Sequence, residues 1–164
     1  MLIREATPDD VTAIHQMIIE LAVYEKEPDA VLASEADLQQ ALFSDEKSRN
    51  GGPAAFAHVA EVDGAVIGFA LWFLNYSTWL GKHGIYLEDL YVKPEFRGQG
   101  AGKALMQKLA LIAVERGYGR FEWWVLDWNS PAIEFYRAHG AQAMDEWTVY
   151  RLSGEELKRM ANEG

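Results

Sequence analysis

Residues 85–102 read Ile85-Tyr86-Leu87-Glu88-Asp89-Leu90-Tyr91-Val92 and, from residue 97, Arg97-Gly98-Gln99-Gly100-Ala101-Gly102. The first part is an apolar run typical of a strand, and a helix-like run begins near Lys103. Glycine has no Cβ, so the loop between strand and helix can approach a ligand closely. The first turn of the helix presents unpaired N–H groups at the positive end of its dipole. The segment therefore predicts a cradle for a pyrophosphate.

The spacing of the glycines narrows the kind of phosphate loop. It differs from G-x-x-x-x-G-K-[ST], which disfavours a nucleoside-triphosphate loop and a kinase, and from the dinucleotide pattern G-x-G-x-x-G. It fits R-x-x-G-x-G, from Arg97 to Gly102. An ordinary strand-to-helix turn is the alternative interpretation of such a loop.

Length and composition indicate one soluble globular domain over residues 1–164 with a substantial core. Hydrophobic residues make up 49% of the chain and charged residues 24%. No apolar run approaches the ~20 residues that span a bilayer, and we expect no membrane association. The N-terminus lacks a signal-peptide pattern, so a cytoplasmic location is expected.

Charge and cysteine content limit the possible chemistry. The chain has 15 Lys and Arg against 25 Asp and Glu, a formal net charge of −10. Such a surface repels nucleic acid and attracts cations, although solubility alone would also explain it. There is no cysteine, which excludes disulfides, thiolate catalysis and thiolate metal sites. The histidines show no metal-ligand spacing, so no metal site is expected.

The order of elements predicts a mixed α and β chain with a run of meander strands, an α+β fold. Thr7-Pro8-Asp9-Asp10 is a helix start, and Ser34 begins a second short helix. Asp63-Gly64 predicts a hairpin turn, and Asn50-Gly51-Gly52-Pro53 breaks the chain. The expected strands are 2–6, 55–62, 65–75, 85–92, 120–126 and 148–152, and the later helices are 104–116, 129–138 and a short one from Ser153.

A second motif follows the strand predicted at 120–126. It reads Trp128-Asn129-Ser130-Pro131-Ala132-Ile133-Glu134-Phe135-Tyr136-Arg137. Asn129 or Ser130 can cap the helix, and Pro131 suits its first turn. Asn129 and Tyr136 are two helical turns apart and share a face. Taken alone, Tyr136 would be interpreted as an aromatic side chain that packs the helix onto the sheet.

Together, R-x-x-G-x-G and N-x-x-A-x-x-F-Y resemble the motifs of the Gcn5-related N-acetyltransferase superfamily. The stretches Tyr24–Lys26, Asn75–Lys82, Tyr86–Val92 and Trp128–Tyr136 extend this resemblance, over nearly the whole chain, to the diamine and thialysine acetyltransferase group. It implies a mixed, mostly antiparallel central sheet with a splay, flanked by helices. It also implies acetyl-CoA as co-substrate, a small cationic amine as acceptor, no metal and a homodimer.

The resemblance also assigns roles to individual residues. Tyr136 would protonate the departing CoA thiolate, and Glu88 would contact the amine and accept its proton directly or through water. Residues that would face the acceptor amine are Glu25, Glu88, Asp89 and Trp147. Residues that would bind acetyl-CoA are Leu90, Tyr91, Val92, Arg97, Gly98, Gln99, Gly100, Ala101, Gly102, Lys103, Asn129 and Ala132.

These residue types suit amine acetylation. An alkyl amine has a pKa near ~10.4 and arrives protonated, so a carboxylate or its water must remove a proton before attack. A backbone N–H, that of Leu90 in the resemblance, would polarise the thioester carbonyl. Period-two geometry places Glu88, Leu90 and Val92 on one strand face and Asp89 and Tyr91 on the other, unless a bulge intervenes. Without the resemblance, Glu88 would be interpreted as a salt-bridged structural carboxylate.

One departure from the group concerns Ser77-Thr78, where polyamine-acetylating members tend to carry an acidic residue. A shorter amine, a diamine or a thialysine-like amino acid is therefore as plausible an acceptor as a long polyamine. Two other functions stay open at this point: acetylation of a protein N-terminus or lysine, and a non-catalytic CoA-binding sensor. The presence of Glu88 and Tyr136 argues against the sensor.

Overall fold

The computed structural model describes residues 1–44 and 53–162. It divides into two compact units, Met1–Leu126 and Asp127–Gly164, which are described in turn. The predicted break at residues 50–53 lies outside the described residues, Pro53 excepted. Across the described residues, no helix is both long and apolar enough to cross a membrane.

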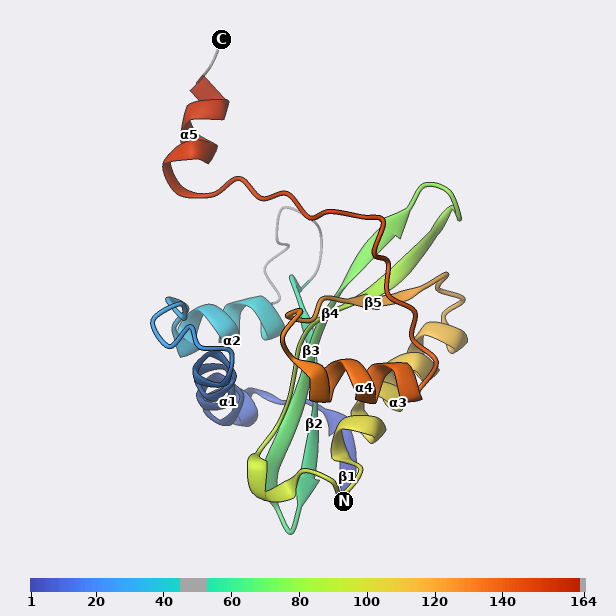
Figure 1. Ribbon diagram of the computed structural model, residues 1–164. Coiled ribbons are helices and arrows are strands. Elements are labelled where there is room, and N and C mark those ends of the chain that lie inside the picture. Colours follow the sequence, from blue (N-terminus) through green and yellow to red (C-terminus); the bar gives the residue numbers. More distant parts are fainter. Residues whose placement is uncertain (45–52, 163–164) are drawn as a thin grey trace. The chain divides into compact units, whose positions relative to one another are not determined.

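The first unit is built on a five-stranded sheet whose strands follow one another in chain order, β1-β2-β3-β4-β5 (Figure 1). The strands are β1 Leu2–Glu5, β2 Phe56–Val62, β3 Ala65–Ser77, β4 Lys82–Val92 and β5 Phe121–Trp123. All neighbours are antiparallel except β4 and β5, which are parallel. The predicted α+β fold around a mixed, mostly antiparallel sheet is confirmed.

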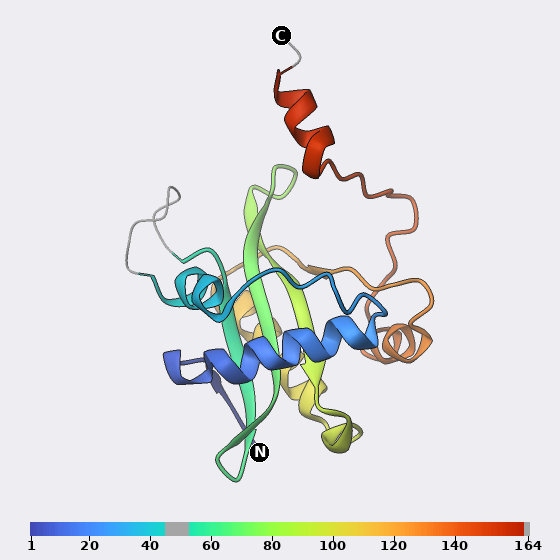
Figure 2. The same cartoon turned by 90° about the vertical axis from the view of Figure 1, so that its left-hand side faces the viewer.

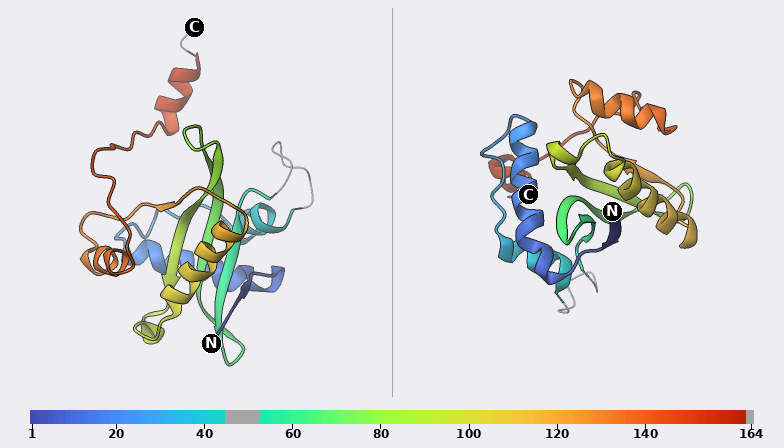
Figure 3. Two further views of the ribbon diagram at one scale, coloured as in Figure 1. Left: turned by 90° about the vertical axis from the view of Figure 1, so that its right-hand side faces the viewer. Right: turned by 90° about the horizontal axis from the view of Figure 1, so that it is seen from below.

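Helices cover both faces of this sheet. The 3-10 turn η1 (Pro8–Asp10), α1 (Val11–Tyr24) and α2 (Glu35–Phe43) belong to one side, and α1 crosses the strands in Figure 2. The turn η2 (Pro94–Phe96) leads to α3 (Ala101–Glu115), which lies on the other face; Figure 3 shows both α1 and α3 against the sheet. The predicted start at Ser34 is confirmed, since its hydroxyl accepts the Asp37 N–H at 3.2 Å in a capping box.

Each face has its own hydrophobic cluster. The α1 cluster includes Ile14, Met17, Phe69 and Tyr91, and the α3 cluster includes Trp72, Ile85, Leu87 and Leu105. Both clusters consist entirely of residues from the first unit. The sheet is thus fixed from both sides, and side chains placed on β4 are held by it.

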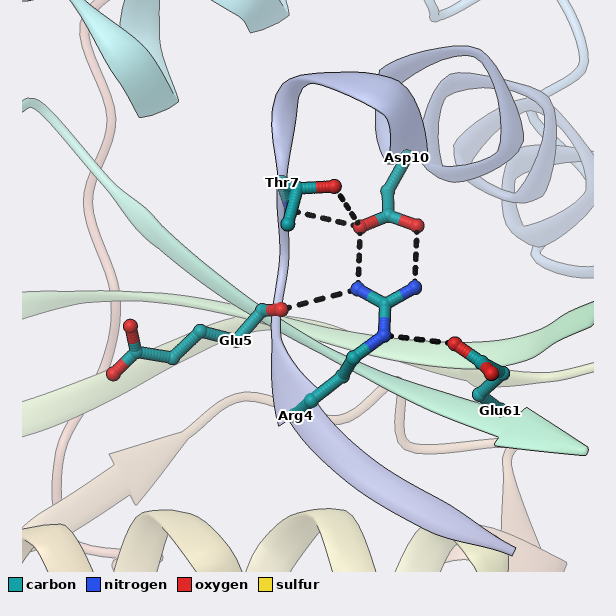
Figure 4. A network of polar contacts seen from close by, with 5 residues as sticks. All are labelled: Arg4, Glu5, Thr7, Asp10 and Glu61. Carbon is teal, nitrogen blue, oxygen red and sulfur yellow. Dashed lines mark hydrogen bonds and ion pairs between the residues drawn. The ribbon is translucent and has the colours of Figure 1, made fainter. Parts of the chain in front are cut away.

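A polar network ties the start of the chain to the sheet (Figure 4). Arg4 on β1 donates to both Asp10 carboxylate oxygens, at 2.7 and 2.9 Å, and its Nε donates to Glu61 Oε2 at 2.8 Å. Asp10 is buried and also accepts the backbone N–H of Thr7 at 2.7 Å. The guanidinium and these hydrogen bonds hold the pKa of Asp10 below its usual range. The predicted helix start at Thr7 is therefore also an anchor to β1 and β2.

Strand β4 carries a bulge at Glu88. Leu71 of β3 lies opposite Asp89 and Trp72 lies opposite Leu87, so Glu88 has no partner in the ladder. Leu87 belongs to the α3 cluster and Tyr91 to the α1 cluster, although an unbroken strand would point both to one face. The prediction that Glu88 shares a face with Leu90 and Val92 was wrong. Glu88 instead shares the α1 face with Asp89.

The bulge also accounts for a short β5. Pairing with β4 extends only over Ile85–Leu87, opposite Phe121–Trp123, and stops where the bulge begins. The predicted strand over residues 120–126 was therefore too long. Beyond Leu87, β4 pairs with β3 on one edge, and within the described residues no strand pairs with its other edge. This separation of β4 from β5 is the splay that the resemblance implied.

The second unit contains α4 (Ser130–Ala138) and α5 (Gly154–Asn162). The predicted helices near 129–138 and after Ser153 are confirmed, but the strand predicted over 148–152 was wrong. A strand needs a neighbour for its N–H and C=O groups, and the described part of this unit contains no other strand. The prediction of one domain over residues 1–164 stays a prediction.

Candidate active site

Three carboxylates converge on the α1 face of the sheet. Glu25 directly follows α1, and the bulge sets Glu88 and Asp89 side by side on β4. The pKa of Asp89 is raised to about 7; burial is the largest cause, and the nearby charges of Glu88 and Glu25 add to it. Burial also raises the pKa of Glu25. Partly desolvated carboxylates that crowd one another favour a cation in their midst, because a cation relieves both penalties.

The open edge of β4 begins beside these carboxylates. The Lys93 N–H donates to the Ile67 carbonyl at 2.9 Å, which fixes the alternation of the antiparallel ladder. Asp89 and Tyr91 then exchange hydrogen bonds with β3, whereas Leu90 and Val92 direct their N–H and C=O groups to the opposite edge. That edge has lost β5, so these backbone groups are available to an extended ligand in the manner of an added strand.

The glycine loop joins this edge to α3. Gly98 and Gly100 adopt φ values of 74° and 86°, which side chains rarely tolerate, and Gly100 is the residue before the first turn of α3. A Cβ built at either position would meet nothing within 4 Å. These glycines are needed for their backbone conformation, and the space over them is open. The first turn of α3, from Ala101 to Lys103, lies where the pyrophosphate cradle was predicted, and its role stays a prediction.

The side chain of Arg97 is engaged away from this loop. Its Nε donates to the Val92 carbonyl at 2.8 Å, and its guanidinium lies 5.2 and 5.3 Å from the ring centroids of Tyr24 and Tyr91. Burial, and then the Glu20 carboxylate, raise the pKa of the Tyr91 hydroxyl, whereas Arg97 lowers it. Glu20 and Tyr24 were not predicted as site residues, although their i, i+4 spacing on α1 makes them neighbours on one helix face.

The second unit holds the remaining predicted site residues. Asn129 caps α4, with its Oδ1 accepting the Ala132 N–H at 3.4 Å, and Tyr136 lies two turns into the same helix. Trp147 lies in the segment between α4 and α5, where its N–H donates to the Met144 carbonyl at 3.1 Å. The roles of these residues stay predictions. That the reaction needs no metal also stays a prediction. Within residues 1–44 and 53–162, no group of three His, Asp or Glu side chains could hold a metal ion.

The first unit combines a mixed, mostly antiparallel sheet, an open edge on β4, a glycine loop before α3 and three neighbouring carboxylates. Residues 16–141 match the acetyltransferase (GNAT) family, and the chain belongs to that family. It is therefore an acetyl-transferring enzyme of a family that uses acetyl-CoA, as the motifs predicted.

Relatives of known name lie in the predicted group. The chain is 40% identical over 174 residues to the thialysine N-epsilon-acetyltransferase of Bos taurus, which covers 98% of this chain and 97% of that protein. It is 34% identical to the L-ornithine N5-acetyltransferase of Arabidopsis thaliana, over 95% of this chain and 86% of that protein. Among solved structures, an integron cassette protein from the V. cholerae mobile metagenome superposes with a TM-score of 0.79 and 29% identity, covering 99% and 98% of the two chains.

Proposed function

We propose that this protein transfers the acetyl group of acetyl-CoA to a primary amine of a small cationic molecule. Candidate acceptors are a diamine, a polyamine or an amino acid such as thialysine or ornithine. The observation that carries this proposal is the bulge that brings Glu88 beside Asp89, near Glu25, where the open edge of β4 begins. The relatives named for thialysine and ornithine acetylation support it.

We propose further that both units act as one acetyltransferase domain over residues 1–164. The family match crosses the boundary between them at Leu126, and the bovine relative matches 98% of the chain. The second unit would contribute Tyr136, Asn129, Ala132 and Trp147, and the first unit the remaining residues of the site.

At the amine end, the three carboxylates have complementary tasks. An acceptor with a pKa near ~10.4 arrives as an ammonium ion, which Glu25 and Asp89 attract and orient. Glu88 is exposed at the bulge, so it can accept the ammonium proton directly or through a water molecule. The neutral amine that results is the nucleophile.

At the thioester end, acetyl-CoA supplies an activated acetyl group. The amine nitrogen attacks the thioester carbonyl, and the Leu90 N–H on the open edge stabilises the negative charge that develops on its oxygen. The N–H groups of Ala101 to Lys103 bind the pyrophosphate, and Val92 binds the pantetheine arm in strand fashion. The chain has no cysteine to carry the acetyl group, which favours direct transfer within a ternary complex.

The leaving thiolate needs a proton as the C–S bond breaks. A phenol with a pKa near ~10 can donate it, and Tyr136 is the residue that the motif assigns to this step. The nitrogen loses a second proton as the amide forms, and solvent returns a proton to the Tyr136 phenolate while Glu88 releases its own proton to solvent. Each turnover therefore converts an ammonium ion and acetyl-CoA into an amide, CoA thiol and one released proton.

The β3–β4 hairpin bears on acceptor length. Ser77 is buried at the end of β3, and its hydroxyl accepts the Leu80 N–H at 3.2 Å, so it shapes the turn. The turn thus carries a structural serine where a carboxylate would serve a second ammonium group. This favours a short acceptor over spermine.

The test is CoA release from acetyl-CoA with putrescine, spermidine, spermine, lysine, thialysine, ornithine, small monoamines and a lysine peptide. We expect turnover with a small amine and a loss of ~10²-fold or more in the Glu88→Gln variant. Glu115→Gln, at the exposed end of α3, is the matched control and should keep full activity. Turnover confined to the peptide, or acetyl-CoA binding without any turnover, would contradict the proposal and indicate a protein substrate or a sensor.

We also propose a cytoplasmic homodimer. The absence of cysteine is compatible with that compartment, and the dimer follows from the resemblance to the diamine acetyltransferases. Sedimentation equilibrium over a range of protein concentrations measures the assembly directly, and a monomer at all concentrations would contradict it.

A further inference from the structure

The side chain of Arg97 links three elements of the first unit. It precedes Gly98 of the loop, its Nε donates to the Val92 carbonyl of β4 at 2.8 Å, and its guanidinium lies 5.2 Å from the Tyr24 ring of α1. The same guanidinium lies 5.3 Å from the ring of Tyr91, which is buried in the α1 cluster. We call Glu20, Tyr24, Tyr91 and Arg97 the Arg97 bridge.

The bridge ends beside the carboxylates of the amine site. Tyr24 immediately precedes Glu25, and Tyr91 follows Asp89 by two residues on the same strand face. Glu20 lies at the other end of the bridge: after burial, Glu20 contributes to the raised pKa of the Tyr91 hydroxyl, whereas Arg97 lowers it. Arg97 therefore contacts two rings, one adjacent in sequence to Glu25 and the other two residues from Asp89 on β4.

The loop end of the bridge is open to an anion. Gly98 and Gly100 have positive φ values with open space above them, so an anion can approach the loop backbone closely. Arg97 precedes Gly98, so an anion bound at this backbone lies next to it in the chain. Its Val92 contact does not block an extended ligand, because a carbonyl oxygen accepts two hydrogen bonds.

We infer that Arg97 is a positioning residue that couples occupancy of the glycine loop to the placement of Glu25 and Asp89, and so to affinity for the amine. This inference rests on the proposed function. Such a coupling is reciprocal: if a filled loop strengthens amine binding by some factor, bound amine strengthens CoA binding by the same factor.

Arg97→Lys separates this role from direct recognition of the pyrophosphate. Lysine keeps the positive charge that an anion needs but lacks the planar guanidinium and the Nε donor. We expect the KM for acetyl-CoA to change less than about twofold, and the KM for the amine at saturating acetyl-CoA to rise on the order of tenfold. Tyr24→Leu should reproduce the rise in amine KM, and the double variant should show no further increase. Arg116→Met, at the exposed end of α3, is the control for loss of a surface arginine and should change neither KM.

Hydrogen exchange gives a readout that needs no turnover. With saturating CoA, we expect protection of residues 97–103 in the wild type and in Arg97→Lys, and protection of residues 20–27 in the wild type alone. Protection of the loop without any change at residues 20–27 in the wild type would overturn the inference while the proposed function stands. A tenfold higher KM for acetyl-CoA with an unchanged amine KM would also overturn it. An unprotected loop in the wild type would contradict the proposed function itself.

Discussion

The two units of the chain hold their candidate site residues by different means. In Met1–Leu126, both hydrophobic clusters, the bulge at Glu88 and the Arg4 network fix side chains on a sheet. In Asp127–Gly164, Tyr136 lies on α4, a helix of nine residues none of which is buried, and Asn129 is its buried cap. This difference leads us to expect that most of the stability resides in the first unit.

Tyr136→Phe tests this division most strongly. Loss of the phenol proton donor should lower kcat on the order of 10² or more, while the melting temperature stays within ~1 °C because no core contact changes. Steady-state CoA release and a thermal melt measure the two quantities. Unchanged turnover would remove Tyr136 as the general acid. A large drop in melting temperature would instead break the comparison between the units.

Asp10→Asn is the opposite case, a substitution expected to change stability and leave the chemistry intact. It would leave the Arg4 guanidinium without its main partner and weaken the hydrogen bonds to Thr7, at a cost of about 2 kcal/mol in the free energy of unfolding. Asp9→Asn, next to it and exposed, is the matched control. Urea unfolding with equal m-values would report the difference, and equal midpoints for the two variants would show that the network contributes nothing.

Gly68→Ala probes the sheet behind the open edge of β4. An added Cβ would lie 2.8 Å from the Tyr91 carbonyl oxygen, a backbone atom that cannot move aside without shifting β4. We expect a loss of about 1–2 kcal/mol and a several-fold higher KM for acetyl-CoA, because Leu90 and Val92 flank the displaced residue. Gly102→Ala is the control for stability, since its Cβ would meet only Val92 Cγ2 at 3.9 Å. Equal stability of the two variants would contradict this account of Gly68.

Local chemistry made part of the molecule predictable. Asp63-Gly64 has the two positive φ values, 50° and 80°, that its hairpin turn requires, and Ser34 forms the cap that its sequence predicts. The bulge was not predictable, because a charged pair inside an apolar strand does not fix the register; the pairing with β3 and the packing of Leu87 and Tyr91 into different clusters show the change of face. The strand predicted over residues 148–152 failed for a related reason, since β-propensity does not supply a neighbouring strand.

Asp89 affects both the stability of the fold and the proposed binding of the amine. Its pKa is raised to about 7 by burial and by Glu88 and Glu25, against ~3.9 in the unfolded chain. Between these values the folded protein holds a proton that the unfolded chain has released. The contribution of protonated Asp89 to the free energy of unfolding is therefore complete below pH ~4 and is lost as the pH rises through ~7. Asp89→Asn cannot titrate, so its melting temperature relative to wild type should climb over this interval, on the order of 10 °C, and then level off.

Glu88→Gln refines the same measurement. Removal of the neighbouring charge should bring the folded-state pKa of Asp89 down, so the loss of stability, which still begins near pH ~4, should end at a lower pH and be smaller in extent. Asp29→Asn, an exposed carboxylate after α1, is the control and should follow the wild-type curve. Thermal melts of all four proteins between pH 4 and 8 make the comparison. A constant difference between Asp89→Asn and wild type at every pH would show that Asp89 is ionised throughout. Neither carboxyl at the bulge would then have a raised pKa. Their attraction for a cation would come from their negative charges alone, and burial would not contribute to it.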